Sequence, residues 1–422
     1  MPASHSSPLA EEPAPAGLDR LLRYVRVDTQ SARDRTESPS TPGQLDLGRM
    51  LVEELREIGL GDAEQDANGY VFATLPATVE GAPVNGLLAH LDTSPDECGT
   101  GVERVVHRDY DGGVIELPKL GTRLDPATMP ELLGKVGHDL VSSSGDTLLG
   151  ADDKAGVAEV MAAVGYLAAH PEVPRAEIRV GFTPDEEIGE GASLFDIERF
   201  GATCAYTLDG SEAGELQDET FTAAGADLVI EGVEVHPGYA TGKLVNAATL
   251  AGRVLAALPA DLTPERTGGR DGFIHVFEVA ADAGKATIRT IVRDFDDDKL
   301  AQHVALLRRT AEEVVGAEPR ARLAVDVRPQ YPNMRSFLDT RPEIIAAAEE
   351  ALRREGYEPK KVPIRGGTDG SVLSARGLLT PNLFTGGHEF HCVREWASVH
   401  DMASAAAVAV RLAGVWAERS EG

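Results

Sequence analysis

Alternation of helix-like and strand-like segments constrains the fold of this 422-residue chain more than any other feature. The spacing of apolar residues predicts helices over residues 43–58 and 154–169. Apolar segments typical of buried strands lie around these helices, at residues 84–91, 176–182 and 202–210. Strands that alternate with helices predict an α/β domain whose mixed sheet is flanked by helices.

The pattern changes over residues 217–330. This segment predicts a strand, a helix, two strands joined by the turn Asp282-Ala283-Gly284, a second helix and a last strand. The order β-α-β-β-α-β predicts a compact α+β lid domain inserted into the first domain. We therefore expect a catalytic domain in two parts, residues 18–216 and 331–422, on either side of the insertion.

The N-terminal residues 1–17 are rich in Pro, Ala and Ser, and we expect them to form a disordered tail. They lack a basic region followed by an apolar region, so they do not resemble a secretory signal. The three cysteines are far apart and predict no disulfide framework, which favours a reducing, cytoplasmic location. No apolar run approaches the ~18 residues that a membrane span requires.

The net charge of −29, from 69 acidic and 40 basic residues, argues against nucleic acid as a partner. The same acidity could raise the local concentration of divalent cations, or could serve solubility alone. A hydrophobic content of 42% is enough for a large core. We expect neither a nucleic acid nor a membrane partner, and the oligomeric state stays open, with a homodimer as one option.

Potential metal ligands follow several of the predicted strands. His90 and Asp92 end the strand at 84–91, and their spacing of two residues puts both on one face. A ligating imidazole usually needs an acceptor for its other nitrogen, which Asp92 could supply. A core histidine followed by a turn aspartate is the alternative.

Asp152 and Asp153 stand side by side in the segment GADDKAGVAEV, where a buried helix begins. One aspartate would suffice as a helix cap. A second carboxylate beside the apolar residues TLLGA would be costly to bury without a partner, and a cation would offset that cost.

Asp185, Glu186 and Glu187 end the strand in FTPDEEIGEG. Three like charges repel one another unless a positive group lies among them, although a solvated acidic loop is the alternative. Adjacent side chains point apart, so Glu186 and Glu187 are expected to have different roles.

Two further segments complete the pattern. Asp209 ends the strand in YTLDG, where a turn is the alternative, and TGGHEFHCVRE offers His388 and His391, of which at most one is expected to bind a metal. Mixed imidazole and carboxylate ligands suit zinc, with cobalt or manganese as alternatives. Five such ligands exceed the needs of one catalytic zinc and favour a pair of metals.

The motifs HLDTSPD, TLLGADDKAGVAEV, FTPDEEIGEG, VEVHPGYA, IVRDFD and IRGGTDGS resemble those of the peptidase T family, in family-like order from about residue 18 to about residue 417. These are tripeptide aminopeptidases of the dizinc aminoacylase and carboxypeptidase superfamily. The resemblance implies that His90, Asp152 and Asp209 hold one zinc. It implies that Glu187 and His391 hold the other, with Asp152 bridging.

The resemblance also implies that Glu186 is the general base and that Asp92 steadies the first histidine ligand. His391 is preferred over His388 because the superfamily's last ligand precedes a glutamate by four residues, here Glu395. The loop departs from the family pattern in one respect, since Cys392 follows the expected ligand where the family has glycine.

The inserted domain contributes His236 in VEVHPG and Arg293 in IVRDFD, and the family resemblance implies that they bind the substrate oxyanion and the peptide's C-terminal carboxylate. Arg365 in IRGGTDG, which we assign to the catalytic domain, is a second candidate for the carboxylate. A loop histidine and a surface arginine are the alternatives. The expected activity is removal of the N-terminal residue from tripeptides.

Three other functions compete with this one. A related dizinc hydrolase (a dipeptidase, desuccinylase or acylase) is the nearest, and a non-catalytic peptide-binding protein is the second. A nucleotide-binding α/β protein is disfavoured because no GxGxxG or GxxxxGK[ST] motif occurs.

Overall fold

The computed structural model describes residues 3–419, and the chain divides into two compact units. The first unit contains Met1–Asp218, Ser336–Val362 and Thr368–Gly422, and the second contains Glu219–Arg335 and Pro363–Gly367. The second unit begins and ends within a few residues of the predicted insertion, but it also includes Pro363–Gly367, which the sequence assigned to the catalytic domain. Residues 1–2 of the predicted tail and 420–422 of the predicted last part lie outside the described residues.

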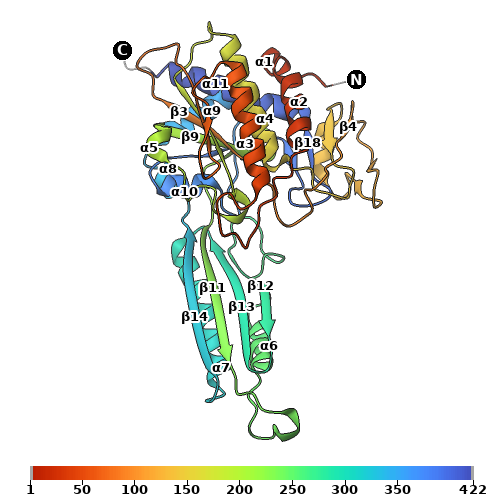
Figure 1. The fold of residues 1–422 in the computed structure, drawn as a ribbon, viewed down its shortest axis with the longest axis vertical. Helices are drawn as coiled ribbons and strands as arrows, with labels where there is room; N and C mark the ends of the chain where they lie inside the picture. Colours follow the sequence, from red (N-terminus) through yellow and green to blue (C-terminus); the bar gives the residue numbers. More distant parts are fainter. Residues whose placement is uncertain (1–2, 420–422) are drawn as a thin grey trace. The chain divides into compact units, whose positions relative to one another are not determined.

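An eight-stranded mixed sheet forms the centre of the first unit (Figure 1). In spatial order its strands are β1 Glu64–Gln65, β2 Val71–Leu75, β8 Ile178–Thr183, β3 Asn85–His90, β9 Cys204–Gly210, β16 Asn382–Phe384, β10 Glu215–Gln217 and β15 Lys360–Lys361. Strand β3 is parallel to both β8 and β9, and β16 is parallel to β9. The carboxyl ends of these central strands therefore meet at one edge of the sheet, where α/β proteins bind ligands.

Helices flank this sheet, as predicted. Helix α4 (Ala151–Ala169) packs on β3 and β9 and contacts α2 (Ala14–Tyr24) and α11 (Val399–Ala417). Its close approach to the sheet requires Gly156, because a Cβ there would lie 1.9 Å from the carbonyl oxygen of Leu208. Short helices α5 (Ile197–Phe200) and α10 (Asp369–Ala375) contribute to a separate aromatic core. Other helices are α1 Pro8–Glu11, α3 Pro42–Ile58, α8 Arg335–Leu338 and α9 Pro342–Arg354.

The prediction of a disordered N-terminal tail is wrong for residues 3–17, because α1 and the start of α2 lie there. Ser7 caps α1, and Ala10 and Ala14 pack against Ala403 and Ala407 of α11. Small alanine side chains let these helices pack closely, and the prolines occupy first-turn positions, where helices tolerate them. Composition alone did not reveal this helix contact.

A second, four-stranded sheet in the first unit was not predicted. Its order is β17 Gly387–His388, β18 Trp396–Ser398, β7 Leu140–Ser142 and β4 Val105–His107. The loop between β17 and β18 carries His391. A pair of two-residue strands, β5 Ile115–Glu116 and β6 Arg123–Leu124, lies nearby in the sequence, followed by the 3-10 helix Pro130–Lys135.

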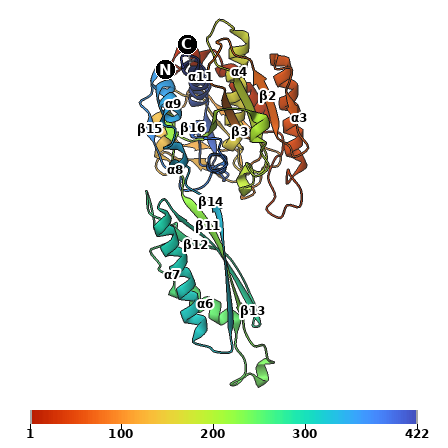
Figure 2. The same ribbon diagram turned by 90° about the vertical axis from the view of Figure 1, so that its left-hand side faces the viewer.

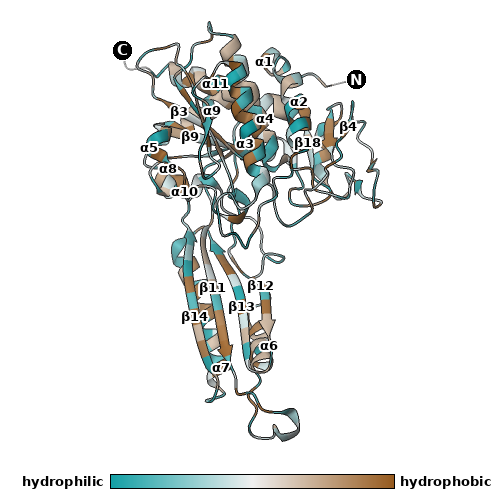
Figure 3. Cartoon of the chain, in the orientation of Figure 1, coloured by the Kyte–Doolittle hydropathy of each residue, from teal (hydrophilic) through white to brown (hydrophobic). Residues whose placement is uncertain are grey.

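The second unit has the predicted β-α-β-β-α-β order. Its antiparallel sheet has the spatial order β12 Phe273–Ala281, β13 Lys285–Asp294, β11 Thr222–Glu231 and β14 Arg322–Tyr331. Helices α6 (Ala247–Ala257) and α7 (Asp297–Gly316) pack together against this sheet (Figure 2). Teal and brown segments alternate along its strands in Figure 3, which is the pattern of a sheet with one buried face. The described part of the chain contains no helix with the length and apolarity of a membrane span.

Candidate metal centre

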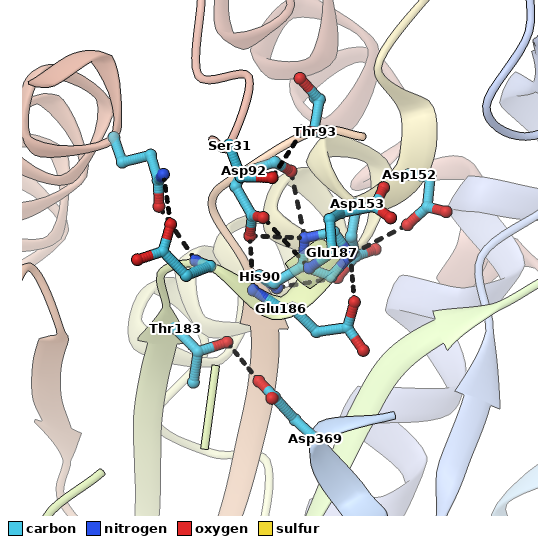
Figure 4. Close-up of polar contacts among 12 residues, drawn as sticks. Ser31, His90, Asp92, Thr93, Asp152, Asp153, Thr183, Glu186, Glu187 and Asp369 are labelled. Carbon is cyan, nitrogen blue, oxygen red and sulfur yellow. Dashed lines mark hydrogen bonds and ion pairs between the residues drawn. The ribbon is translucent and has the colours of Figure 1, made fainter. Parts of the chain in front are cut away.

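His90 ends strand β3 and is buried at the sheet's ligand-binding edge. Its Nδ1 lies 3.1 Å from the carbonyl oxygen of Asp92 and 3.3 Å from Asp92 Oδ1. Because the carbonyl can only accept, Nδ1 carries a hydrogen, and Nε2 is the nitrogen that would offer its lone pair to a metal. Nε2 faces Asp152 Oδ1 at 2.9 Å, so the histidine presents its ligating nitrogen to the acidic residues (Figure 4).

Asp152 lies between the two histidines that the sequence singled out. Its Oδ1 faces His90 Nε2, and its Oδ2 lies 3.3 Å from His391 Nε2. Burial alone would raise the pKa of Asp152, but hydrogen bonds from His391 and His90 outweigh burial and hold that pKa below its usual value. One carboxylate thus presents an oxygen to each imidazole, the arrangement that a bridging ligand needs.

Asp153 has a different role from its neighbour, to which it is joined by a cis peptide bond. It accepts the backbone N–H of Gly156 at 3.1 Å, a helix-capping hydrogen bond, and that of His90 at 3.0 Å. Two groups of residues have potential metal-ligand atoms within 4.8 Å of one another. One group is His90, Asp153 and Asp209, and the other is His90, Asp152 and Glu187. Because both oxygens of Asp153 already accept backbone hydrogens, Asp152 is the better metal ligand of the pair.

Glu186 and Glu187 begin the one-turn 3-10 helix Glu186–Ile188 after β8. Asp92 orients both, since its two carboxylate oxygens accept their backbone N–H groups at 2.9 and 3.1 Å. Glu187 Oε2 lies 2.9 Å from His391 Nε2, whereas Glu186 Oε2 lies 3.9 Å from His90 Nε2. The two neighbours therefore face different parts of the cluster, as predicted from their adjacency.

Burial and like charges perturb these carboxyl groups strongly. Burial, followed by repulsion from Asp152, raises the pKa of Glu187 to about 8. Burial also raises the pKa of Glu186 well above its usual value, with a further contribution from Asp209. Both shifts show that these carboxyl groups lie in a buried, acid-rich environment that disfavours their charged forms.

Asp209 and His391 complete the cluster. Asp209 is the penultimate residue of β9, with Oδ1 3.6 Å from His90 Nε2. His391 belongs to the loop between β17 and β18 and has a positive φ of 60°. His388 does not reach the cluster, because its buried ring stacks on Trp396 with centroids 4.1 Å apart. Of the two histidines in TGGHEFHCVRE, His391 is the one that the structure brings to the acids.

We call His90, Asp152, Glu187, Asp209 and His391 the ligand cluster. Glu187 Oε1 is buried without a hydrogen-bond partner among the described residues. Four of the five side chains are buried or partly buried, His391 is exposed, and three of the five are acids. An orphaned carboxylate oxygen among mixed imidazole and carboxylate donors fits divalent metal binding.

Sequence analysis missed the supporting role of Glu395. Its Oε2 accepts the backbone N–H groups of Leu149 and Gly150, both at 2.8 Å, and its Oε1 accepts that of Asp152 at 3.0 Å. This buried carboxylate fixes the loop that presents Asp152. A single acid four residues after a histidine carries no signal of such long-range backbone contacts.

Asp185 also serves as a support. This buried aspartate has a positive φ and accepts hydrogen bonds from the Ser40 backbone at 2.8 Å and from Gln44 Nε2 at 2.8 Å. The first acid of the triplet thus anchors the strand end to the start of α3. It does not join the ligand cluster.

The three predicted substrate-binding residues belong to the second unit. His236 is exposed, and its Nδ1 accepts the Gly238 N–H at 3.1 Å. Burial lowers the pKa of Arg293, whose Nη1 donates to Val292 O at 3.1 Å. Arg365 Nη1 donates to the carbonyl oxygens of Gly269 and Asp271 at 3.0 and 2.8 Å.

Comparison with known proteins identifies the family. The model of Peptidase family M20/M25/M40 matches residues 148–414. Peptidase T from Bacillus subtilis (strain 168) is 47% identical over 398 residues, which cover 94% of this chain and 97% of that protein. The chain belongs to the peptidase T family. As a member of this family it is a peptidase, an enzyme that hydrolyses peptide bonds.

Solved structures share the fold over almost the whole chain. An aminopeptidase PepT from Bacillus cereus has a TM-score of 0.73 at 23% identity, covering 96% of this chain and 99% of that one. A Staphylococcus aureus tripeptidase has a TM-score of 0.75 at 18% identity with the same coverage. A Bacillus subtilis protein described as a dinuclear metal binding peptidase from the M20 family has a TM-score of 0.62 at 16% identity, again with that coverage. At these identities the similarity concerns the fold alone.

Proposed function

We propose that this peptidase is a metal-dependent aminopeptidase that removes the first residue of tripeptides. The observation that carries the proposal is Asp152, whose two carboxylate oxygens face His90 and His391 at 2.9 and 3.3 Å. A carboxylate between two histidines, with Asp209 and Glu187 on either side, suits a pair of divalent ions. The peptidase T relatives support the choice of short peptides as substrates.

The ligand cluster would hold two zinc ions, with cobalt or manganese as substitutes. His90 and Asp209 would serve one ion, and Glu187 and His391 the other, with Asp152 shared. The ions would supply Lewis acidity to the attacking water and to the peptide carbonyl. Asp92 would keep His90 in the tautomer that leaves Nε2 free, through the contacts at Nδ1.

Glu186 is the proposed general base. Its buried carboxylate would accept a proton from the attacking water and later donate that proton to the leaving amine. Burial and the neighbouring Asp209 raise the pKa of Glu186, which strengthens this carboxylate as a proton acceptor. Asp92 fixes the backbone of Glu186 at 2.9 Å and so holds the base in position.

His236, Arg293 and Arg365 are proposed to bind the peptide. His236 is the candidate for the oxyanion, and Arg293 for the C-terminal carboxylate, which an arginine fork can bind through two parallel hydrogen bonds. Arg365 is the second candidate for the carboxylate, although backbone carbonyls already occupy part of its guanidinium. C-terminal amidation of a tripeptide should weaken catalysis, and unchanged catalysis would exclude an arginine anchor for the carboxylate.

The decisive experiment is a peptide panel assayed after chelation and again after zinc is returned. The panel contains di-, tri- and tetrapeptides, each with a free, N-acetylated or C-terminally amidated form. We expect chelation to abolish hydrolysis, zinc to restore it, and the free tripeptide to be the best substrate. Persistent activity after chelation would exclude the metal mechanism, and preference for N-acetylated substrates would favour an acylase.

We also propose a cytoplasmic location. Cys98, Cys204 and Cys392 are all free, as expected for a reducing compartment. Fractionation of cells that express the full chain, with detection of the enzyme outside the cytoplasmic fraction, would contradict this location.

A further inference from the structure

Asp369 is a buried acid beside the ligand cluster to which no role has been assigned. It occupies the first position of α10, in the first unit, and its side chain is 6% exposed. Thr183, the last residue of β8, donates its hydroxyl hydrogen to Asp369 Oδ2 at 2.6 Å. Figure 4 shows this pair close to Glu186 and His90, and the Asp369 carboxylate contributes to the raised pKa of Glu186. The Asp369 carboxylate therefore lies within electrostatic reach of the proposed base.

The other buried supporting acids around the cluster already have full sets of donors. Asp92 accepts two backbone N–H groups, Asp153 accepts two, and Glu395 accepts three. Asp185 accepts from Ser40 and Gln44. Asp369 differs, because within residues 3–419 Thr183 is the one hydrogen-bond donor recorded for its carboxylate. A buried carboxylate with so few donors is costly unless a cation approaches it.

The surrounding loop is shaped around this carboxylate. A Cβ at Gly191 would lie 2.3 Å from Asp369 Oδ1, so a side chain at that position would displace the acid. Tyr70 fixes the loop by donating its hydroxyl hydrogen to Gly191 O at 2.8 Å, and Arg376 donates to Ala192 O. The position of Asp369 is therefore built into the fold and is not that of a free surface acid.

We propose that Asp369 binds the α-ammonium group of the substrate's first residue. The inference rests on the proposed aminopeptidase function, which requires a free N-terminal amine near the attacked carbonyl. An ammonium group brings one positive charge and three donors, which is what the poorly satisfied carboxylate lacks. Thr183 is then a positioning residue, since its hydroxyl holds one oxygen and leaves Oδ1 for the amine.

The test compares trialanine with propanoyl-alanyl-alanine, which has the same shape without the amine. Asp369→Asn removes the charge and keeps the shape of the side chain. We expect kcat/KM for trialanine to fall by about 10- to 100-fold, the range for a lost charge-assisted hydrogen bond, with the loss mainly in KM. The slow rate for the amine-free analogue should stay the same, so the preference for the free amine disappears.

Two further variants make the test specific. Thr183→Val should reduce the preference for the free amine in the same direction but less, because it only loosens Asp369. Asp185→Asn is the matched control, since Asp185 is another buried acid of this region and already accepts from Ser40 and Gln44. It should change the rates for both peptides by the same factor. Metal content and thermal unfolding should be measured for each variant.

The outcomes separate the two proposals. If the wild type prefers trialanine, and Asp369→Asn or Thr183→Val keeps that preference, only the amine-binding role of Asp369 is wrong. A uniform loss for both peptides in folded, metal-loaded Asp369→Asn would make Asp369 structural. If the wild type cleaves the analogue as well as trialanine, or cleaves neither, then the aminopeptidase function fails and the role of Asp369 fails with it.

Discussion

The two units of this chain use charged residues in opposite ways. On the sheet of the second unit, Arg328 pairs with Asp227 at 2.8 Å and Arg289 with Glu278 at 2.7 Å, and these arginines are about half exposed. In the first unit, acids gather at buried strand ends with few positive groups among them. Water solvates both charged groups of an exposed ion pair, so such a pair contributes little to stability. Buried acids without a positive partner destabilise the folded state and have strongly perturbed pKa values. Burial, and not charge content, distinguishes the reactive region from the scaffold.

The largest expected effect comes from Glu186→Gln in the buried region. The substitution removes the proposed proton acceptor, so kcat for a tripeptide should fall by at least the ~10²–10⁴-fold typical of general acid–base catalysis. Metal content should stay the same, because Glu186 is not a proposed ligand. Glu190→Gln, a nearby acid paired with Arg35 at 2.8 Å on the surface, is the matched control and should retain activity. Full activity in Glu186→Gln would exclude Glu186 as the base.

The next effect is expected from Glu395→Gln, which weakens the support of the loop before Asp152. Residues that orient metal ligands typically contribute ~10–100-fold to metal affinity or activity, and we expect a loss of that size in zinc affinity. Competition with a chelator measures it. The control is Glu389→Gln. Glu389 lies with Glu395 in the loop between β17 and β18 but pairs with Arg394 at 3.1 Å, so this substitution should leave zinc affinity unchanged. Equal affinities in the two variants would contradict the positioning role of Glu395.

Glu159 tests whether a buried acid without a partner lowers the stability of the folded protein. It is buried in α4, and neither of its oxygens has a hydrogen-bond partner among the described residues. Burial raises the pKa of Glu159 well above its usual value, so folding favours the protonated form. The folded state is therefore penalised as pH rises from the unfolded pKa of Glu159 towards its folded pKa.

Glu159→Met should accordingly stabilise the protein at neutral pH by ~1–3 kcal/mol, the cost of a buried unsatisfied polar group. The gain should shrink as the pH falls towards ~4.3, the usual glutamate value. Urea unfolding at several pH values measures the difference. A gain that is independent of pH would show that Glu159 is not the titrating group.

The smallest effect is expected on the exposed sheet of the second unit. Arg328→Ala should change the free energy of unfolding by less than ~1 kcal/mol, because partly exposed ion pairs are screened by water and salt. High salt should reduce the difference further. Activity should be unaffected. A loss of several kcal/mol would contradict the distinction between the two regions.

The secondary structure was predictable because its signals are local. The helices at 43–58 and 154–169 appear as α3 and α4, and the hairpin turn at Asp282-Ala283-Gly284 lies between β12 and β13. The N-terminal helices were missed because Pro- and Ala-rich sequence resembles a flexible tail until its packing partner is known. The small sheet that carries His391 was missed because its strands have only two or three residues.

The strand-end acids were visible in the sequence, but their contacts were not. The division of Asp152 and Asp153 between metal binding and capping could be proposed from one helix start that needs one cap. The three backbone hydrogen bonds of Glu395 could not, because they join segments more than 240 residues apart. Asp369 was overlooked for the same reason, since Thr183 lies 186 residues away in the sequence.

The segment Pro363–Gly367 has a consequence for protein engineering. Ile364 donates its N–H to Glu219 O at 2.8 Å, and its carbonyl oxygen accepts the N–H of Phe221 at 3.1 Å. These backbone hydrogen bonds join the segment to the rest of the second unit. Arg365 adds hydrogen bonds to Gly269 and Asp271. The polypeptide consequently crosses between the units at four places, not two. Excising residues 219–335, or transplanting them into a relative, would sever these links, so the second unit is not an interchangeable cassette.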